Sequence, residues 1–85
     1  MIITVQLHSL SGSFASPWGK DVFTGTIGGA YALLRDWACQ HDRLGAEPTD
    51  AHALVWKGRI DDVTECYPDW ELTVGPRGGI RRTPV

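Results

Sequence analysis

Alternating apolar and polar residues predict two strands, one near each end of the chain. In residues 2–8, Ile3, Val5 and Leu7 would face a core, while Thr4, Gln6 and His8 would face outward. Residues 70–74 (WELTV) alternate in the same way. A period of two is typical of a strand that buries one face. Both segments are therefore predicted to be strands of a half-covered sheet.

Residues 28–44 have the spacing of an amphipathic helix. Apolar side chains recur every three or four positions and form one stripe, which comprises Ala30, Leu34, Trp37, His41 and Leu44. Polar side chains occupy the opposite side. Gly45 follows, and glycine commonly ends a helix because it adopts the left-handed conformation without strain. We expect the helix to bury this stripe, including His41.

The remaining segments are shorter. Residues 21–27 are rich in β-branched and aromatic residues and predict a strand. Residues 53–60 (ALVWKGRI) also predict a strand, with Gly58 at a bulge or tight turn. Residues 9–19 read as a long loop, and residues 75–79 (GPRGG) have the composition of a turn. Residues 80–85 are either a short edge strand or a frayed tail.

The order of these elements predicts an α+β fold. A single helix would pack on one face of a four- or five-stranded mixed sheet, in the order β-β-α-β-β with an optional last strand. One helix across one face buries the apolar stripes of both layers. With 85 residues the chain is expected to form one domain, spanning residues 1–85. A chain of this size needs most of its apolar side chains for its own core.

This order resembles the ubiquitin-like, or β-grasp, fold. The resemblance rests on MIITVQL, ALVWKGRIDD and WELTV, and on Arg77-Gly78-Gly79, which is similar to the family's C-terminal signature. It implies a modifier or sulfur carrier after processing at Gly79, because such proteins present a terminal double glycine to an activating enzyme. The first loop is longer than the family's hairpin turn, and residues 80–85 continue past the glycines. We favour a glycine-rich hairpin turn at this position.

The charge distribution is uneven. The formal net charge is −2, which argues against generic binding of nucleic acid. Residues 61–71 form an acidic run without a basic residue, made of Asp61, Asp62, Glu65, Asp69 and Glu71. Arg77, Arg81 and Arg82 make the C-terminus basic. These arginines keep a nucleic-acid-binding module as an alternative, although charge that protects an edge strand is the commoner explanation.

Composition also suggests where the protein acts. No stretch approaches the roughly 18 apolar residues of a membrane span, and the N-terminus lacks the features of a signal peptide. We therefore expect a cytoplasmic protein without a membrane partner. Cys39 and Cys66 are expected to be free, mostly buried thiols. Abundant alanine and glycine, more arginine than lysine and no asparagine favour a GC-rich genome and fit a small phage-encoded protein that modulates its host.

No motif in the sequence indicates catalysis or a cofactor. Cys39 and His41 are two positions apart on a helix and cannot share a face, and structural zinc sites usually have two close ligand pairs. Cys39 lies inside the helix and Cys66 in the acidic run, so neither has the surroundings of a reactive thiolate. Gly25, Gly28 and Gly29 fit neither common phosphate-binding spacing. The sequence predicts no metal, no cofactor and no enzymatic activity.

The loop of residues 9–19 is the preferred binding segment. It carries no charge and includes Leu10, Phe14 and Trp18. Phe14 and Trp18 would either fold back over the core or remain exposed as the aromatic anchors that dominate protein interfaces. Asp61, Asp62 and Glu65 would attract a basic partner. The sequence therefore predicts a non-catalytic module that binds another protein with a basic surface.

Overall fold

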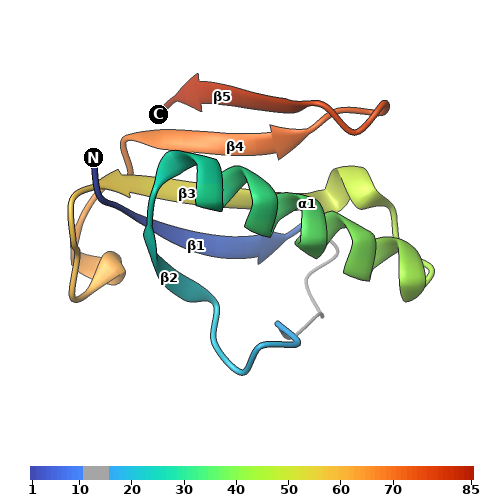
Figure 1. Cartoon of the computed structure of the whole chain (residues 1–85), viewed down its shortest axis with the longest axis horizontal. Coiled ribbons are helices and arrows are strands. Elements are labelled where there is room, and N and C mark those ends of the chain that lie inside the picture. Colours follow the sequence, from blue (N-terminus) through green and yellow to red (C-terminus); the bar gives the residue numbers. More distant parts are fainter. Residues whose placement is uncertain (11–15) are drawn as a thin grey trace.

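The computed structural model describes residues 1–10 and 16–85, and in this part of the chain one helix packs on a five-stranded sheet (Figure 1). In chain order the elements are β1 (Ile3–Ser9), β2 (Val22–Gly25), α1 (Ile27–Arg43), η1 (Pro48–Asp50), β3 (Ala51–Lys57), η2 (Val63–Glu65), β4 (Trp70–Val74) and β5 (Ile80–Pro84). The two η elements are single turns of 3₁₀-helix. The predicted α+β class with a helix on one face of the sheet is confirmed.

The strand order across the sheet is β2-β1-β3-β4-β5, and every neighbouring pair is antiparallel. The mixed sheet predicted from the sequence is therefore wrong. β2 and β3 both run antiparallel to β1, so they are parallel to each other, but β1 lies between them and they never pair. The ubiquitin-like assignment is not confirmed, because the strand order differs from the order in that fold.

Helix α1 begins and ends at recognisable caps. The Oγ1 of Thr26 accepts a hydrogen bond from the Gly29 amide at 3.1 Å, and Gly45 follows the helix with a φ of 78°. The predicted buried stripe is confirmed from Ala30 to His41, but Leu44 is wrongly included because it is 61% exposed. Leu44 is the C-cap with non-helical backbone angles, so its side chain leaves the direction of the stripe.

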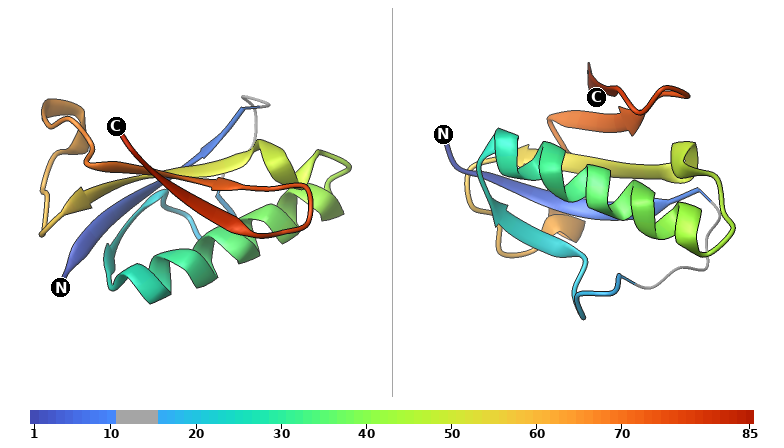
Figure 2. Two further views of the ribbon diagram at one scale, coloured as in Figure 1. Left: turned by 90° about the horizontal axis from the view of Figure 1, so that it is seen from above. Right: turned by 45° about the vertical axis from the view of Figure 1, so that its right-hand side comes forward.

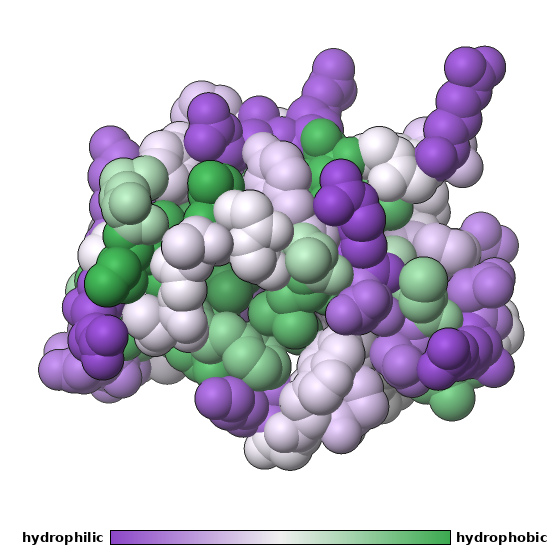
Figure 3. All heavy atoms as spheres, viewed as in Figure 1, coloured by the Kyte–Doolittle hydropathy of each residue, from purple (hydrophilic) through white to green (hydrophobic). Residues whose placement is uncertain are grey.

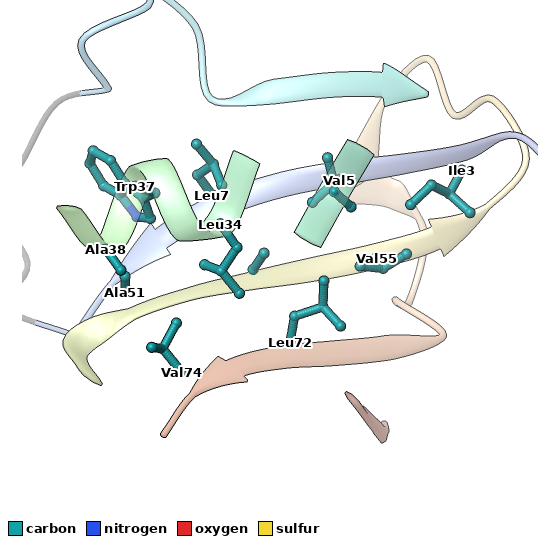
Figure 4. Close-up of a cluster of buried hydrophobic side chains, with 12 residues drawn as sticks. Ile3, Val5, Leu7, Leu34, Trp37, Ala38, Ala51, Val55, Leu72 and Val74 are labelled. Carbon is teal, nitrogen blue, oxygen red and sulfur yellow. The ribbon is translucent and has the colours of Figure 1, made fainter. Parts of the chain in front are cut away.

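The main core lies between α1 and the sheet (Figure 4). Alternate residues of the three central strands face the helix, and the buried cluster is Ile3, Val5, Leu7, Ala30, Leu34, Trp37, Ala38, Ala51, Ala53, Val55, Leu72 and Val74. Full burial of one aliphatic side chain contributes about 1.5–3 kcal/mol. The alternation seen in residues 2–8 and 70–74 therefore corresponds to this layer.

The opposite face of the sheet is covered at one end by residues 58–69. Figure 2 shows α1 on one side of the sheet and this segment on the other. Thr4 donates to the Gly58 carbonyl at 2.8 Å and accepts from the Ile60 amide at 2.9 Å. Trp56 donates through Nε1 to the Cys66 carbonyl at 2.9 Å. Thr4, predicted to face outward, is consequently fully buried on the face away from the helix.

Two glycines with positive φ change the direction of the main chain in the second half of the protein. Gly58 follows the last residue of β3 with a φ of 79°, and the main chain bends there, so the position predicted as a bulge or tight turn is a bend in the left-handed conformation that glycine adopts without strain. Gly78 has a φ of 83° in the turn between β4 and β5, where Gly75 donates to the Gly79 carbonyl at 2.7 Å. Residues 80–84 form β5, so of the two alternatives for this segment the strand is observed.

Cys39 and Cys66 are both free thiols, as expected, but both are exposed, so the prediction of mostly buried thiols is wrong. Cys39 lies outside the buried stripe of α1, and Cys66 belongs to the segment that only partly covers the sheet. None of the described helices is long and apolar enough to cross a bilayer.

Candidate interaction surfaces

Among the described residues, the loop after β1 has two large hydrophobic side chains that are exposed. Leu10 is 71% exposed, and its amide donates to the Asp50 carbonyl at 2.9 Å. Trp18 is 40% exposed, with its ring centroid 6.2 Å from that of Phe23 and 6.3 Å from that of Trp37. Trp18 therefore packs against Phe23 and Trp37 at the edge of the core, and part of its ring remains exposed to solvent. Phe14 lies outside the described residues.

Next to the loop after β1 lies a cluster of hydrogen-bonded residues from α1 and the end of β1. Trp37 donates through Nε1 to the His8 carbonyl at 2.8 Å, and its ring lies edge-on to His41 at 4.5 Å. His41 is buried and donates through Nδ1 to the Trp37 carbonyl, while Nε2 lies 2.7 Å from the Ser9 hydroxyl. Because the Trp37 carbonyl can only accept, Nδ1 carries a proton. These contacts fix the C-terminal half of α1 to the end of β1.

Leu44 extends the exposed surface at the end of α1. It follows His41 by three residues, and Ala46 donates to the His41 carbonyl at 2.8 Å, which folds the chain back beside the cluster. We use the name apolar end for three exposed residues, each of which adjoins a different member of this cluster: Leu10 follows Ser9, Trp18 contacts Trp37, and Leu44 donates to the His41 carbonyl. Leu44 was not among the predicted binding residues, because its helical spacing predicts burial. Its position directly before Gly45 is the signal that marks it as a cap.

The acidic residues predicted to assist this surface lie elsewhere. Asp61, Asp62 and Glu65 are exposed, but the segment that carries them lies over the face of the sheet opposite to α1. Asp62 accepts hydrogen bonds from the side chain and the amide of Thr64, which lower the pKa of its carboxyl group. The fold therefore does not join these carboxylates to Leu10 and Trp18 in one surface. Tyr67, which has no sequence pattern that singles it out, is 95% exposed in this segment.

Two histidines meet on the open part of the face away from α1. The rings of His8 and His52, on paired positions of β1 and β3, stack at 5.3 Å with an interplanar angle of 22°. His8 Nε2 donates to the side-chain oxygen of Gln6 at 3.0 Å. Burial and, to a smaller extent, the neighbouring His52 lower the pKa of His8, while Asp21 and Glu71 act in the opposite direction. Stacked rings of this kind make a polar, half-buried surface.

The three C-terminal arginines do not share one surface of the sheet. Arg77 lies in the turn before β5, and Arg81 pairs with Thr73 on the open face. Arg82 lies on the helix side, with its guanidinium 5.1 Å from the ring centroid of Trp70. Adjacent residues of a strand face opposite sides of the sheet, so Arg81 and Arg82 do not form one basic stripe.

Two hollows flank the helix. One, of about 230 Å³, lies between β2 and the first half of α1 and is lined by apolar side chains that include Phe23, Ala30 and Leu33 (Figure 3). The other, of about 430 Å³, lies between α1 and the β4–β5 hairpin and includes Ala38, Cys39 and Val74. Within residues 1–10 and 16–85, no three histidine, cysteine or carboxylate side chains are arranged to hold a metal ion.

No protein-family model matches this chain, and neither the curated proteins nor the solved structures contain a significant match.

Proposed function

We propose that this protein is a small binding module that recognises another protein through the apolar end. The observation that carries the proposal is the exposure of Leu10, Trp18 and Leu44 beside a hydrogen-bonded base formed by Trp37, His41 and Ser9. Large apolar side chains that remain exposed around a packed support are typical of interface anchors, and tryptophan is enriched among them. Because the base is already ordered, little conformational entropy is lost when a partner docks.

The acidic residues act at a distance in this proposal. Asp61, Asp62 and Glu65 lie on the other side of the sheet and would not touch a partner held at the apolar end. Their charge would still accelerate the encounter with a basic protein, an effect that weakens as salt is added.

The proposal is tested with a double variant, Leu10→Ser with Leu44→Ser, used as bait beside the wild-type protein. Both side chains are exposed, so the free energy of unfolding should change by no more than about 0.5 kcal/mol. We expect the double variant to lose a protein that the wild type captures and that binds the purified wild type directly. Val85→Ser, which removes an exposed apolar side chain elsewhere, is the matched control and should retain binding. Equal binding by all three baits would contradict the proposal.

A further inference from the structure

The outer edge of β5 is an exposed strand edge at one border of the sheet. β5 is the last strand in the order β2-β1-β3-β4-β5, and residues 81–85 are exposed. In the space-filling view, long hydrophilic side chains project from the border where β5 lies (Figure 3). The edge therefore combines main-chain groups with charged side chains, and both can contact a partner.

The register of β4 and β5 identifies which main-chain groups face outward. Gly75 donates to the Gly79 carbonyl, and Val85 donates to the Asp69 carbonyl, so both of these pairs are at hydrogen-bonding positions. Hydrogen-bonded and non-hydrogen-bonded pairs alternate along an antiparallel ladder. With the observed register, the amides of Arg81 and Thr83 point toward β4, and those of Ile80 and Arg82 point outward.

The outward-facing stretch has a defined end. Pro84 occupies the next outward position and has no N–H to offer, although its carbonyl remains an acceptor. A strand added to this edge would thus pair mainly along Ile80 and Arg82.

The side chains beside this stretch are cationic on both faces. Arg81 lies on the open face, and Arg82 lies on the helix side, where it stacks over Trp70. Lys57 also lies over Trp70, with its Nζ 5.3 Å from the ring centroid. An extended peptide has side chains on both faces, so two adjacent acidic residues in it would meet one cation on each side.

We propose that β5 binds an extended acidic peptide segment, which adds to the sheet as a sixth strand. Main-chain hydrogen bonds to Ile80 and Arg82 would give affinity, and the arginines would select acidic residues. This interaction is independent of the apolar end and can hold or fail separately from it.

Charge disfavours two other occupants of this edge. In a second copy paired about a two-fold axis at Arg82, two Arg82 side chains would lie directly opposite each other, and like charges in that position are destabilising. Arg81 and Arg82 point to opposite faces, so a single polyanionic backbone lying on one surface would not reach both. The opposite edge, β2, has four residues and no cationic side chain of its own, although Lys20, just before it, lies with its Nζ 5.0 Å from the ring centroid of Phe23.

The direct test uses a short blocked peptide with two adjacent glutamates among threonines and valines, and a control peptide with lysines in place of the glutamates. We expect the glutamate peptide to slow hydrogen exchange of the Ile80 and Arg82 amides, which face solvent in the unbound protein. The Arg81 and Thr83 amides, already bonded to β4, should change little. No added protection at Ile80 and Arg82, or equal binding of the lysine peptide, would overturn the proposal.

Two substitutions at one position separate strand addition from simple charge attraction. Arg82→Gln and Arg82→Pro both remove the guanidinium, but only proline also removes the outward N–H. We expect Arg82→Gln to bind the glutamate peptide a few-fold more weakly than wild type, and Arg82→Pro about tenfold more weakly again. Arg59→Gln, an equal charge change in the segment after β3, should leave the affinity unchanged.

Further outcomes are decisive. If Arg82→Pro fails to fold, a glutamate peptide N-methylated at alternate residues replaces it and should likewise bind about tenfold more weakly than its unmodified form.

Equal affinities of the glutamine and proline variants for the glutamate peptide would show that the site is an electrostatic patch alone. Tighter binding of a single-stranded oligonucleotide that displaces the peptide would show a nucleic-acid site, and dimers of the peptide-free protein that dissociate in Arg82→Pro would show self-pairing. Each of these three results would overturn the proposal.

Discussion

The two faces of the sheet bury side chains by different means. On the face under α1, apolar residues from β1, β3 and β4 pack in a continuous layer against the helix. On the other face, residues 58–69 cover only one end of the sheet. Thr4 and Trp56 are buried beneath this segment and form hydrogen bonds with its main chain. The rest of that face carries half-buried side chains such as His8, His52 and Leu54. Alternation along a strand thus indicates which residues share a face of the sheet. Whether that face is buried depends on a segment elsewhere in the chain that packs on it, here α1 or residues 58–69.

This contrast predicts a difference in how each face responds to mutation. Apolar contacts are numerous and non-directional, so the layer under the helix should contribute most of the stability. The hydrogen bonds at the closed end are few, but each satisfies a buried polar group that would otherwise be costly.

The largest effect is expected from leucine truncation under the helix. Leu72→Ala removes a fully buried side chain of β4 and should lower the free energy of unfolding by about 2–5 kcal/mol. Leu54→Ala makes the same change in the neighbouring strand on the opposite face, where the side chain is half-buried, and should cost about 1 kcal/mol. Urea denaturation of both variants measures the difference. Similar losses would mean that the two faces contribute alike.

An intermediate effect is expected from Thr4→Val, which keeps the shape of the side chain and removes its hydroxyl. The Gly58 carbonyl and the Ile60 amide would both lose their partner, at a cost of about 1–3 kcal/mol. Faster hydrogen exchange at Ile60 should accompany the loss of stability. Thr24→Val, at the exposed neighbouring position of β2, is the control and should stay within about 0.5 kcal/mol of wild type. Unchanged exchange at Ile60 would show that other contacts hold residues 58–69.

The smallest effect is expected from pH on the open part of the face. The pKa of His8 lies below its ordinary value of 6.5, mainly because of burial and then because of His52. The unfolded chain therefore takes up this proton at higher pH than the folded protein does, so stability contributed by neutral His8 is present above pH 6.5 and is lost as the pH falls below it. His8→Gln should have a melting temperature that declines less steeply with acidification. Parallel pH profiles for the two proteins would contradict this expectation.

The sequence predicts the elements of this fold better than their arrangement. The alternation in residues 2–8 and 70–74 and the spacing from Ala30 to His41 reflect local periodicity, which one sequence displays directly. Strand pairing depends on contacts between distant segments, so the β1–β3 pair and the purely antiparallel sheet could not be deduced. The stacking of His8 on His52 was missed for the same reason.

The candidate surfaces were predictable only in part. Leu10 and Trp18 stood out as candidates because a long uncharged loop has no regular pattern that would bury them, but the sequence left open whether Trp18 folds back over the core, and the structure shows a partly exposed ring in contact with Trp37. Leu44 was misassigned because it continues the helical spacing up to the cap, where the backbone geometry changes. The cationic edge was visible in composition, but the outward direction of the Arg82 amide depends on a register that only the paired strands define.

The position of β1 in the interior of the sheet also sets the order of events during synthesis. Its longest partner, β3, begins at Ala51, and the pair joins residues separated by 42–54 positions, from Ser9↔Ala51 to Ile3↔Lys57. Closing so long a loop carries an entropic cost before any contact is gained, which slows folding. During synthesis β1 cannot complete its pairing with β3 until Lys57 has left the ribosome. Before then, its available partner in the sheet is the four-residue strand β2. During that interval the nascent chain exposes Ile3, Val5 and Leu7 on an unprotected strand, the period in which a chaperone would bind it.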